Sequence, residues 1–457
     1  MTLSPVQLEA ITRADGRRGY AYFMEMGLGK TLTVLTEFKV MQRCGAVDKL
    51  VVICPNSFKS GWADEIKKHG LGFSYHIYES SYSVFNMIDI NVMIMNYEAV
   101  RTDKGREVLE YFMRSDTYLA LDESIKLKNR TAKQTQAIVG TDHKRYPKRG
   151  IASYAKVVRL LSGKPMSQGP HDLWAQLKAI GATQGISYFG WQARFCQLGG
   201  WENRQVVGTL NEDLLQKIIE PVAFQAKKQD WLKGLPTKAY TTRRYQLGPV
   251  LQKHYNEMES DFLTYLEGEE RVSVEVAIAK WEKCSQIQCG FVIDEEGKAQ
   301  TLVDHPSNPR LQLLQEILDE EVSGKVVIVY RHRAAGLALA ARYHGEMAWI
   351  AGGMSPAEID EQKKLFDSRR IMLLQAEAGK YGHTLIGTPD DPCATMIFFE
   401  NSYSLDTRSQ LEDRIHRMGA TAESCLYVDL SGSDCDARIA RALQNKQRMF
   451  EQVFEPA

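Results

Sequence analysis

"YAYFMEMGLGKTLTVL" (Tyr20–Leu35) is the stretch that indicates the fold, because an apolar run enters a short glycine-containing loop and a helix-like run follows. Gly27 and Gly29 allow a tight backbone path in which several N–H groups point inward. The helix that begins near Lys30 adds the positive end of its dipole. A strand, a loop and a helix in this order predict a phosphate-binding loop.

The side chains of this loop suit a nucleotide with its metal ion. Lys30 is expected to reach the terminal phosphates, and the Thr31 hydroxyl to ligate magnesium. Met24 stands where the strict pattern has glycine, so a glycine turn with an incidental lysine is the alternative. The predicted cofactor-binding residues of the loop are Met26, Gly27, Leu28, Gly29, Lys30 and Thr31.

A second chemical signal is "TYLALDES" (Thr117–Ser124), in which Asp122 and Glu123 follow an apolar strand. Asp122 suits holding magnesium, directly or through water, and Glu123 suits orienting and deprotonating an attacking water. A solvated acidic turn is the alternative. A phosphate loop upstream on the same sheet favours the catalytic interpretation.

Length and charge bound the remaining possibilities. The 457 residues suggest two or three domains, and 57 Lys+Arg against 57 Asp+Glu give no overall field that attracts a polyanion. Any nucleic-acid binding must therefore come from local patches. The first residues lack a signal-peptide pattern, no run of about 18 apolar residues suggests a membrane span, and the eight cysteines are scattered. These features favour a cytoplasmic protein, nucleoid-associated or in a phage-infected host, with no membrane partner.

Strand and helix patterns alternate in two regions of the chain. Residues 1–180 carry β-branched runs at Lys49–Pro55, Asn91–Tyr97, Thr117–Ser124 and Val157–Gly163, and residues 301–457 carry similar runs at Gly324–Arg331, Arg370–Gly379, Ala394–Glu400 and Cys425–Leu430. Residues 181–300 show aromatic and charged side chains at helical spacing. The patterns predict an α/β protein: two parallel-sheet lobes with a mainly helical insertion between them.

A third signal is "SQLEDRIHRMG" (Ser409–Gly419), where Arg414 and Arg417 are three residues apart and share a helix face. Guanidinium groups suit the charge that develops on a transferring phosphoryl group. An arginine pair on a solvated helix face is the alternative. A second α/β lobe that completes an ATP site favours the catalytic interpretation.

These stretches, in this order, resemble the Swi/Snf-type ATPases of helicase superfamily two, in particular compact bacterial, phage-like or annealing-helicase-like members. The resemblance extends to about Asp429. "LSPVQLEAI" resembles the adenine-reading motif and assigns Gln7 to the base; "MEMGLGKT", "LDES", "RLLSGKPMSQGPHDLWAQL" and "LEDRIHRMG" resemble motifs one, two, three and six. The resemblance implies two RecA-like lobes, ATP and Mg2+ as cofactors, and Lys30, Asp122, Glu123, Arg414 and Arg417 as catalytic residues.

The resemblance also implies contacts with DNA. "VVICPNSFKSGWADEIKKH" and "MNYEAV" resemble motifs that grip one DNA strand, and the expected DNA-binding residues are Pro55, Ser57, Asn96, Lys164, Gly379 and Lys380. Lys164 occupies the threonine position of motif three, and motif five has His383 and Thr384 in place of its usual pattern. Lys164 is expected to neutralise Glu123, approach a DNA phosphate or point into solvent, and to weaken the coupling of hydrolysis to DNA.

Three functions compete. The first is a monomeric, DNA-stimulated ATPase that moves along double-stranded or branched DNA and remodels or reanneals it. The second is a strand-separating DNA or RNA helicase. The third is a motor-shaped protein that binds nucleic acid or a protein partner and hydrolyses ATP poorly because of Lys164 and the altered motif five.

Overall fold

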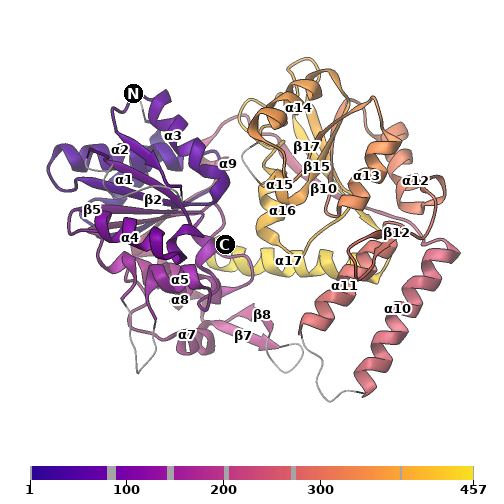
Figure 1. The fold of residues 1–457 in the computed structure, drawn as a ribbon, viewed down its shortest axis with the longest axis horizontal. Helices are drawn as coiled ribbons and strands as arrows, with labels where there is room; N and C mark the ends of the chain where they lie inside the picture. The colour runs from indigo at the N-terminus through magenta and orange to yellow at the C-terminus, as the bar shows by residue number, and fades with distance from the viewer. Residues whose placement is uncertain are drawn as a thin grey trace. The chain divides into compact units, whose positions relative to one another are not determined.

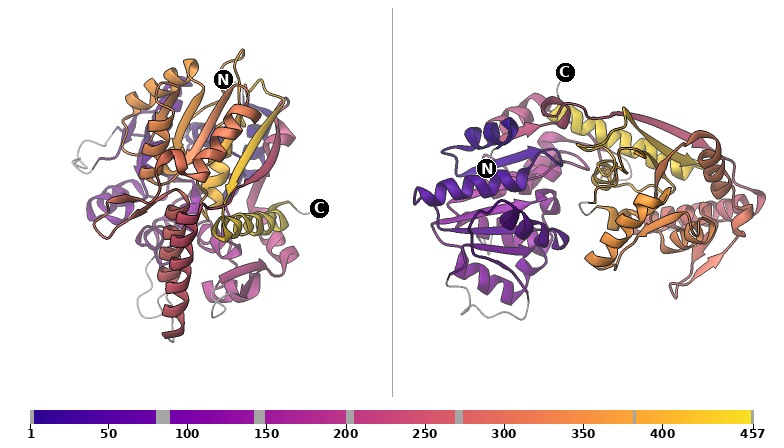
Figure 2. Two further views of the ribbon diagram at one scale, coloured as in Figure 1. Left: turned by 90° about the vertical axis from the view of Figure 1, so that its right-hand side faces the viewer. Right: turned by 90° about the horizontal axis from the view of Figure 1, so that it is seen from above.

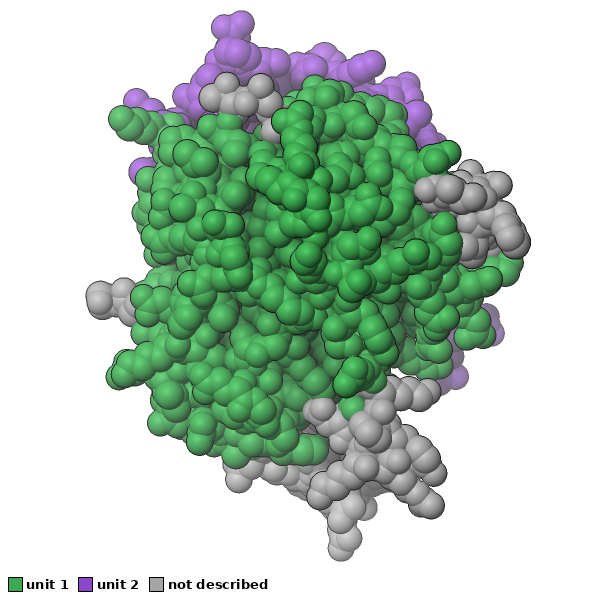
Figure 3. Space-filling model, turned by 90° about the vertical axis from the view of Figure 1, so that its left-hand side faces the viewer, with its two compact units in different colours: residues 1–233, 445–457 green, residues 234–444 purple. Residues whose placement is uncertain are grey.

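The structure is a computed structural model that describes residues 3–79, 89–141, 149–199, 205–268, 274–380 and 383–455, without the side chains of 261–268 and 274–278. The chain forms two compact units (Figure 3). The first contains Met1–Lys233 and Asn445–Ala457, and the second contains Gly234–Gln444.

The first unit is built on a seven-stranded, parallel sheet (Figure 1). Its strands, in spatial order, are β3 (Tyr75–Ile77), β4 (Val92–Asn96), β2 (Lys49–Cys54), β5 (Thr117–Asp122), β6 (Val157–Leu161), β1 (Gly19–Met24) and β9 (Ala223–Ala226). Its helices are α1 (Pro5–Ala14), α2 (Lys30–Arg43), α3 (Lys59–Lys68), α4 (Asp103–Phe112), α5 (Lys133–Val139), α6 (Leu173–Ala179), α7 (Tyr188–Phe195), α8 (Glu212–Ile219) and α9 (Lys228–Trp231). A small hairpin of β7 (Cys196–Gly199) and β8 (Gln205–Thr209) is added to this unit.

Alternate residues of each central strand enter two different cores, as expected for a sheet covered on both faces. In β1, Ala21 and Phe23 pack with α4, α5, α6, α7 and α8 on one face. Tyr22 and Met24 pack with α1, α2 and α3 on the other. The continuous apolar strands seen in the sequence are therefore buried on both sides.

The second unit contains a six-stranded sheet in which all recorded pairings are parallel. Its strands, in spatial order, are β10 (Thr237–Arg244), β17 (Ser424–Ser431), β16 (Cys393–Phe398), β13 (Lys325–Tyr330), β15 (Ile371–Gln375) and β14 (Met347–Ile350). The helices of this unit are α10 (Pro249–Gly268), α11 (Val274–Gln288), α12 (Pro309–Glu316), α13 (Arg333–Arg342), α14 (Pro356–Ser368), α15 (Ala376–Gly379) and α16 (Leu405–Glu412). Strands β11 (Phe291–Ile293) and β12 (Ala299–Thr301) form a short hairpin, and α10 and α11 run side by side (Figure 1, Figure 2).

The prediction of two parallel-sheet α/β lobes is confirmed, but the units divide at other residues than the predicted 1–180, 181–300 and 301–457. The middle segment is shared between the units, since β9 completes the first sheet and β10 pairs with β17 in the second. Strand β10 is exposed along most of its length, so it lacks the apolar run that marks a buried strand.

The C-terminal residues are divided between the two units. Helix α17 (Asp434–Phe454) begins in the second unit, and its last residues belong to the first. Met449, Val453 and Phe454 are buried in the core of the first unit, and the Phe454 ring packs edge-on against Phe23 with centroids 5.8 Å apart. In the part of the chain that the structure describes, no helix is both long and apolar enough to cross a membrane.

Candidate active site

The loop between β1 and α2 has the backbone of a phosphate cradle. Gly27 and Gly29 have φ of 92° and 79°, a left-handed conformation that side chains with a Cβ rarely adopt. A Cβ at Gly29 would also lie 2.2 Å from the Gln7 amide nitrogen, so a larger residue there would displace the Gln7 side chain. Helix α2 begins directly after Gly29, at Lys30, so its free N–H groups face the same loop.

Lys30 lies inside this loop. Its Nζ donates to the Met24 carbonyl at 2.8 Å and to the Glu25 carbonyl at 3.4 Å. Its charge also lowers the pKa of Asp122, so the two side chains are close enough to interact. Met26 is part of the loop, whereas the Leu28 side chain is buried in the core and only its backbone can face a ligand.

The acidic pair lies on the same sheet edge, two strands from the loop. Strand β6 pairs with both β1 and β5, and Leu161 is opposite both Tyr22 and Asp122. Asp122 and Glu123 are each 6% exposed, which excludes the solvated acidic turn. Glu123 has φ of 49° and ψ of 55°, a left-handed conformation that is uncommon for a residue other than glycine and that recurs at functional sites.

Asp122 is held by three hydrogen bonds. Oδ2 accepts from the Trp62 indole at 2.8 Å, Oδ1 accepts from the Glu123 backbone at 3.0 Å, and the Asp122 carbonyl accepts from the Tyr97 hydroxyl at 2.8 Å. Burial raises the pKa of the Asp122 carboxyl, while the bond from Trp62 and the charge of Lys30 oppose this. The carboxylate is therefore fixed in direction before any ligand arrives.

Asp122 and Thr31 fit a magnesium ion, because their carboxylate and hydroxyl oxygens are ligands that Mg2+ accepts together with phosphate oxygens. The nearby glycines leave the loop backbone open, and the charge of Lys30 acts on Asp122. Within the described ranges, no group of three or more His, Cys, Asp or Glu side chains forms a metal site of its own.

Gln7 lies beside the phosphate loop. Its Nε2 donates to the Gly29 carbonyl at 3.1 Å, and its Oε1 accepts from the Ser4 backbone at 2.8 Å. Both ends of the amide are thus used within the first unit, and Gln7 ties α1 to the loop. Its contact with an adenine base stays a prediction.

Motif three also reaches the loop, since a Cβ on Gly163 would lie 3.3 Å from the Met26 nitrogen. The next residue, Lys164, contacts α17. This contact differs from the three roles expected for Lys164, namely neutralising Glu123, approaching a DNA phosphate or pointing into solvent. Its ammonium donates to Gln447 and lies 4.8 Å from the centre of the Phe450 ring. A DNA contact by Lys164 stays a prediction.

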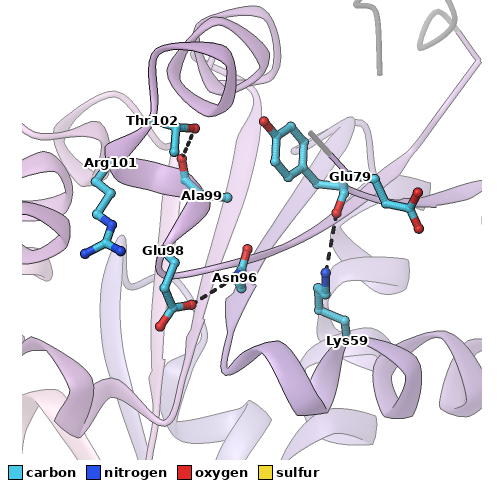
Figure 4. Close-up of a pocket in the computed structure, with 8 residues that line it drawn as sticks. Lys59, Glu79, Asn96, Glu98, Ala99, Arg101 and Thr102 are labelled. Atoms are coloured by element: carbon cyan, nitrogen blue, oxygen red, sulfur yellow. Dashed lines mark hydrogen bonds between the residues drawn. The ribbon is translucent and has the colours of Figure 1, made fainter. Parts of the chain in front are cut away.

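The expected DNA-binding motifs after β2 and β4 border a hollow of about 410 Å³ in the first unit (Figure 4). It is lined by Lys59, Tyr78, Glu79, Asn96, Glu98, Ala99, Arg101 and Thr102. Asn96 donates to the Glu98 carboxylate at 2.9 Å, and Lys59 donates to the Tyr78 carbonyl at a long 3.4 Å (Figure 4). We name this hollow, with these eight residues, the β2–β4 pocket.

The other residues expected to bind DNA are outside the β2–β4 pocket. Pro55 is buried after β2, and Ser57 is exposed in the next turn. Gly379 is buried at the end of α15, where a Cβ would lie 2.5 Å from Leu411, so packing alone explains this glycine. Lys380 pairs with Glu377 at 2.7 Å. Their roles in DNA binding stay predictions.

The prediction that Arg414 and Arg417 share a helix face is wrong, because α16 ends at Glu412 and both arginines lie in the turns that follow it. The two arginines also differ in their surroundings. Arg414 is completely buried and donates to the carbonyls of Gln410, His383 and Lys380 at 2.7, 3.3 and 3.3 Å. Arg417 is partly exposed and donates to the His383 carbonyl at 3.3 Å and the Thr384 hydroxyl at 2.7 Å. Burial lowers the pKa of Arg417, and the charge of Asp413 opposes this effect. The guanidinium is therefore partly desolvated, which strengthens its attraction to an anionic ligand.

Sequence reasoning missed two residues at this edge. Trp62, on α3, reads as a core residue of an amphipathic helix, yet its indole reaches Asp122. Lys228, at the start of α9, is 4% exposed, and its Cε would lie 3.7 Å from a Cβ at Gly27. For Trp62, the one signal in the sequence was its place in a stretch that resembles a DNA-binding motif. Lys228 gave no local signal, because it is about 200 residues from the phosphate loop in the sequence.

A glycine cradle with a lysine, beside a buried acidic pair on one parallel sheet, defines a nucleotide-phosphate site of the P-loop type. The model of the SNF2-related domain matches residues 19–289, and the chain belongs to this family.

The curated relatives are longer than this chain. It is 22% identical to the ISWI chromatin-remodeling complex ATPase CHR11 of Arabidopsis thaliana, over 94% of this chain and 40% of that protein. It is 23% identical to a Caenorhabditis elegans homolog of the SWI/SNF-related matrix-associated actin-dependent regulator of chromatin subfamily A-like protein 1, over 99% and 62%. The chain thus spans less than two thirds of either relative. Among solved structures, the Sulfolobus solfataricus SWI2/SNF2 ATPase core in complex with dsDNA is 17% identical, with a TM-score of 0.45, over 100% of this chain and 98% of that one.

Proposed function

We propose that this protein is a DNA-stimulated ATPase that moves along double-stranded DNA and remodels or reanneals DNA structures. The observation that carries the proposal is the shared sheet edge of the first unit. The phosphate loop follows β1 and the acidic pair follows β5, while the β2–β4 pocket lies after the neighbouring strands of the same sheet. Ligands of parallel sheets bind at this edge.

The residues of the first unit have separate tasks in hydrolysis. The loop amides and Lys30 hold the phosphates, and Thr31 and Asp122 hold Mg2+, which when bound neutralises developing charge on the phosphates. Glu123, fixed by its buried position, orients the attacking water and accepts its proton. For the second unit, the family resemblance assigns Arg414 and Arg417 to the charge of the transferring phosphoryl group; Arg417 is the more exposed of the two, and Arg414 also holds the segment around His383 in place.

The β2–β4 pocket suits a phosphate of a nucleic-acid backbone. Lys59 and Arg101 bring two cations, and Asn96 and Thr102 bring neutral polar groups. None of these groups selects a base, so binding is expected to be insensitive to sequence and to weaken as salt is raised. Glu79 and Glu98 also line the pocket and temper its positive charge, which suits the phosphates of one strand of a duplex better than a large polyanionic surface.

ATP turnover with no nucleic acid, duplex DNA, single-stranded DNA and RNA tests this function. We expect duplex DNA to raise turnover most, and displacement of a third strand from a duplex to require ATP. Preferential stimulation by single strands or RNA would favour a strand-separating helicase. Binding without turnover would favour the poorly hydrolysing, motor-shaped protein.

A further inference from the structure

Two walls of the β2–β4 pocket lead to the same catalytic residue. Lys59 begins α3, and Trp62 follows one helical turn later, so both side chains lie on one side of the helix. Asn96 ends β4, and Tyr97 is the next residue. Trp62 donates to the Asp122 side chain and Tyr97 to the Asp122 carbonyl, each at 2.8 Å.

The connecting side chains are rigidly placed. Trp62 and Tyr97 are each 2% exposed and Asp122 is 6% exposed, so water cannot replace either hydrogen bond. Asp122 in turn accepts from the backbone of Glu123, whose left-handed conformation leaves few alternative arrangements. A small shift of Trp62 or Tyr97 therefore changes the direction of the Asp122 carboxylate and the backbone that carries Glu123.

We propose that Trp62 and Tyr97 are positioning residues that transmit phosphate binding in the β2–β4 pocket to Asp122 and Glu123. This inference rests on the proposed function, in which the pocket binds DNA and the acidic pair hydrolyses ATP. A phosphate at Lys59 replaces its long hydrogen bond to the Tyr78 carbonyl by a shorter, hydrogen-bonded ion pair and pulls on the first turn of α3. Trp62 moves with that turn because a helix turn is stiff compared with a side chain.

The test compares Trp62→Phe with a matched control, Trp191→Phe. Trp191 is also buried in the first unit, and its indole donates to a backbone carbonyl, that of Pro170, at 2.9 Å. Each variant keeps a six-membered aromatic ring and loses the indole N–H together with part of the indole volume, so the loss of volume is matched between the two variants. We expect Trp62→Phe to lower the ratio of duplex-stimulated to basal turnover roughly tenfold, since a bond to a charged group is lost. Its duplex affinity without nucleotide should stay within about twofold of the unsubstituted protein, and Trp191→Phe should keep the full ratio.

A double variant separates transmission from general damage. Lys59→Ala alone should weaken duplex binding and lower the stimulation at saturating duplex, and in the Trp62→Phe background it should lower the stimulation no further. Tyr97→Phe should act in the same direction as Trp62→Phe.

The inference is overturned if Trp62→Phe keeps the full ratio, if Trp191→Phe loses it equally, or if the effects of Lys59→Ala and Trp62→Phe are additive. If the unsubstituted protein hydrolyses ATP but duplex DNA does not stimulate it, the proposed function fails and this inference fails with it.

Discussion

Lys164→Thr is expected to loosen the C-terminal helix from the first unit. The Lys164 ammonium donates to Gln447 and lies 4.8 Å from the Phe450 ring centre. Phe450 stacks on Phe454 at 4.9 Å, and Phe454 packs on Phe23 of β1. Loss of the hydrogen bond costs about 1 kcal/mol and loss of the cation–π contact about 0.5–1 kcal/mol at a partly exposed site. The sum is about 1.5–2 kcal/mol.

Hydrogen exchange of the backbone amides in residues 445–455 measures this cost. If these residues open locally, the protection factors should fall roughly ten- to thirtyfold in Lys164→Thr, while the central strands of the first unit keep theirs. Lys39→Thr is the matched control, because Lys39 also donates to a neutral oxygen, the Leu71 carbonyl at 2.9 Å, and lies 5.9 Å from the Phe73 ring centre. Unchanged protection of residues 445–455 in Lys164→Thr, or an equal loss in Lys39→Thr, would refute the reasoning.

Three further predictions concern the chemistry and the stability of the two units. Lys30→Ala should abolish productive ATP binding in a nucleotide titration. Glu123→Gln should bind ATP but show no turnover, and near-normal turnover would exclude Glu123 as the residue that activates water. Arg417→Ala should lower kcat strongly with little effect on duplex affinity or unfolding temperature. Arg414→Ala should cost about 3–5 kcal/mol in the second unit, because it empties the space of a large buried side chain and removes the hydrogen bonds to the Gln410 and Lys380 carbonyls. Equal unfolding temperatures of the two variants would contradict this distinction. Burial lowers the pKa of His332, and the nearby charge of Arg331 lowers it too. Hydrogen bonds to Glu282 and Glu400 outweigh both effects and raise the pKa of His332 to about 9. Protonated His332 therefore stabilises the folded second unit fully below about pH 6.5, and this stabilisation is lost as the pH rises through about 9. His332→Gln should make the unfolding temperature less dependent on pH between about pH 6.5 and 10, and an unchanged slope would contradict this role of His332.

Much of the fold could be predicted because strands that are buried on both faces are continuous apolar runs. Lys49–Cys54 and Thr117–Asp122 are of this kind, and both were expected within a residue or two. Strand β10 was not predicted, since an exposed edge strand has neither an apolar run nor a one-sided alternation. The return of Met449 to Phe454 to the first core depends on contacts between residues hundreds of positions apart, which no local pattern encodes.

The candidate site shows the same division. The phosphate loop and the acidic pair were predicted because each is a short local motif with a fixed chemical purpose. Trp62 was missed as a hydrogen-bond donor to Asp122 because the two residues are 60 positions apart, and a buried tryptophan on a helix is ordinarily a core residue. The surroundings of Arg414 were also missed, because the pattern predicted a helix with Arg414 and Arg417 on one face, whereas α16 ends at Glu412 and Arg414 is buried in the turn that follows.

Steady-state ATP turnover with and without duplex DNA, measured in parallel for the unsubstituted protein and Glu123→Gln, tests the central claim most directly. Duplex DNA should raise the turnover of the unsubstituted protein several-fold or more, and a higher salt concentration should reduce this stimulation at a fixed, non-saturating duplex concentration. Glu123→Gln should show no turnover in either condition, although it still binds ATP and duplex. Turnover that is equal with and without duplex, or that survives in Glu123→Gln, would contradict this claim.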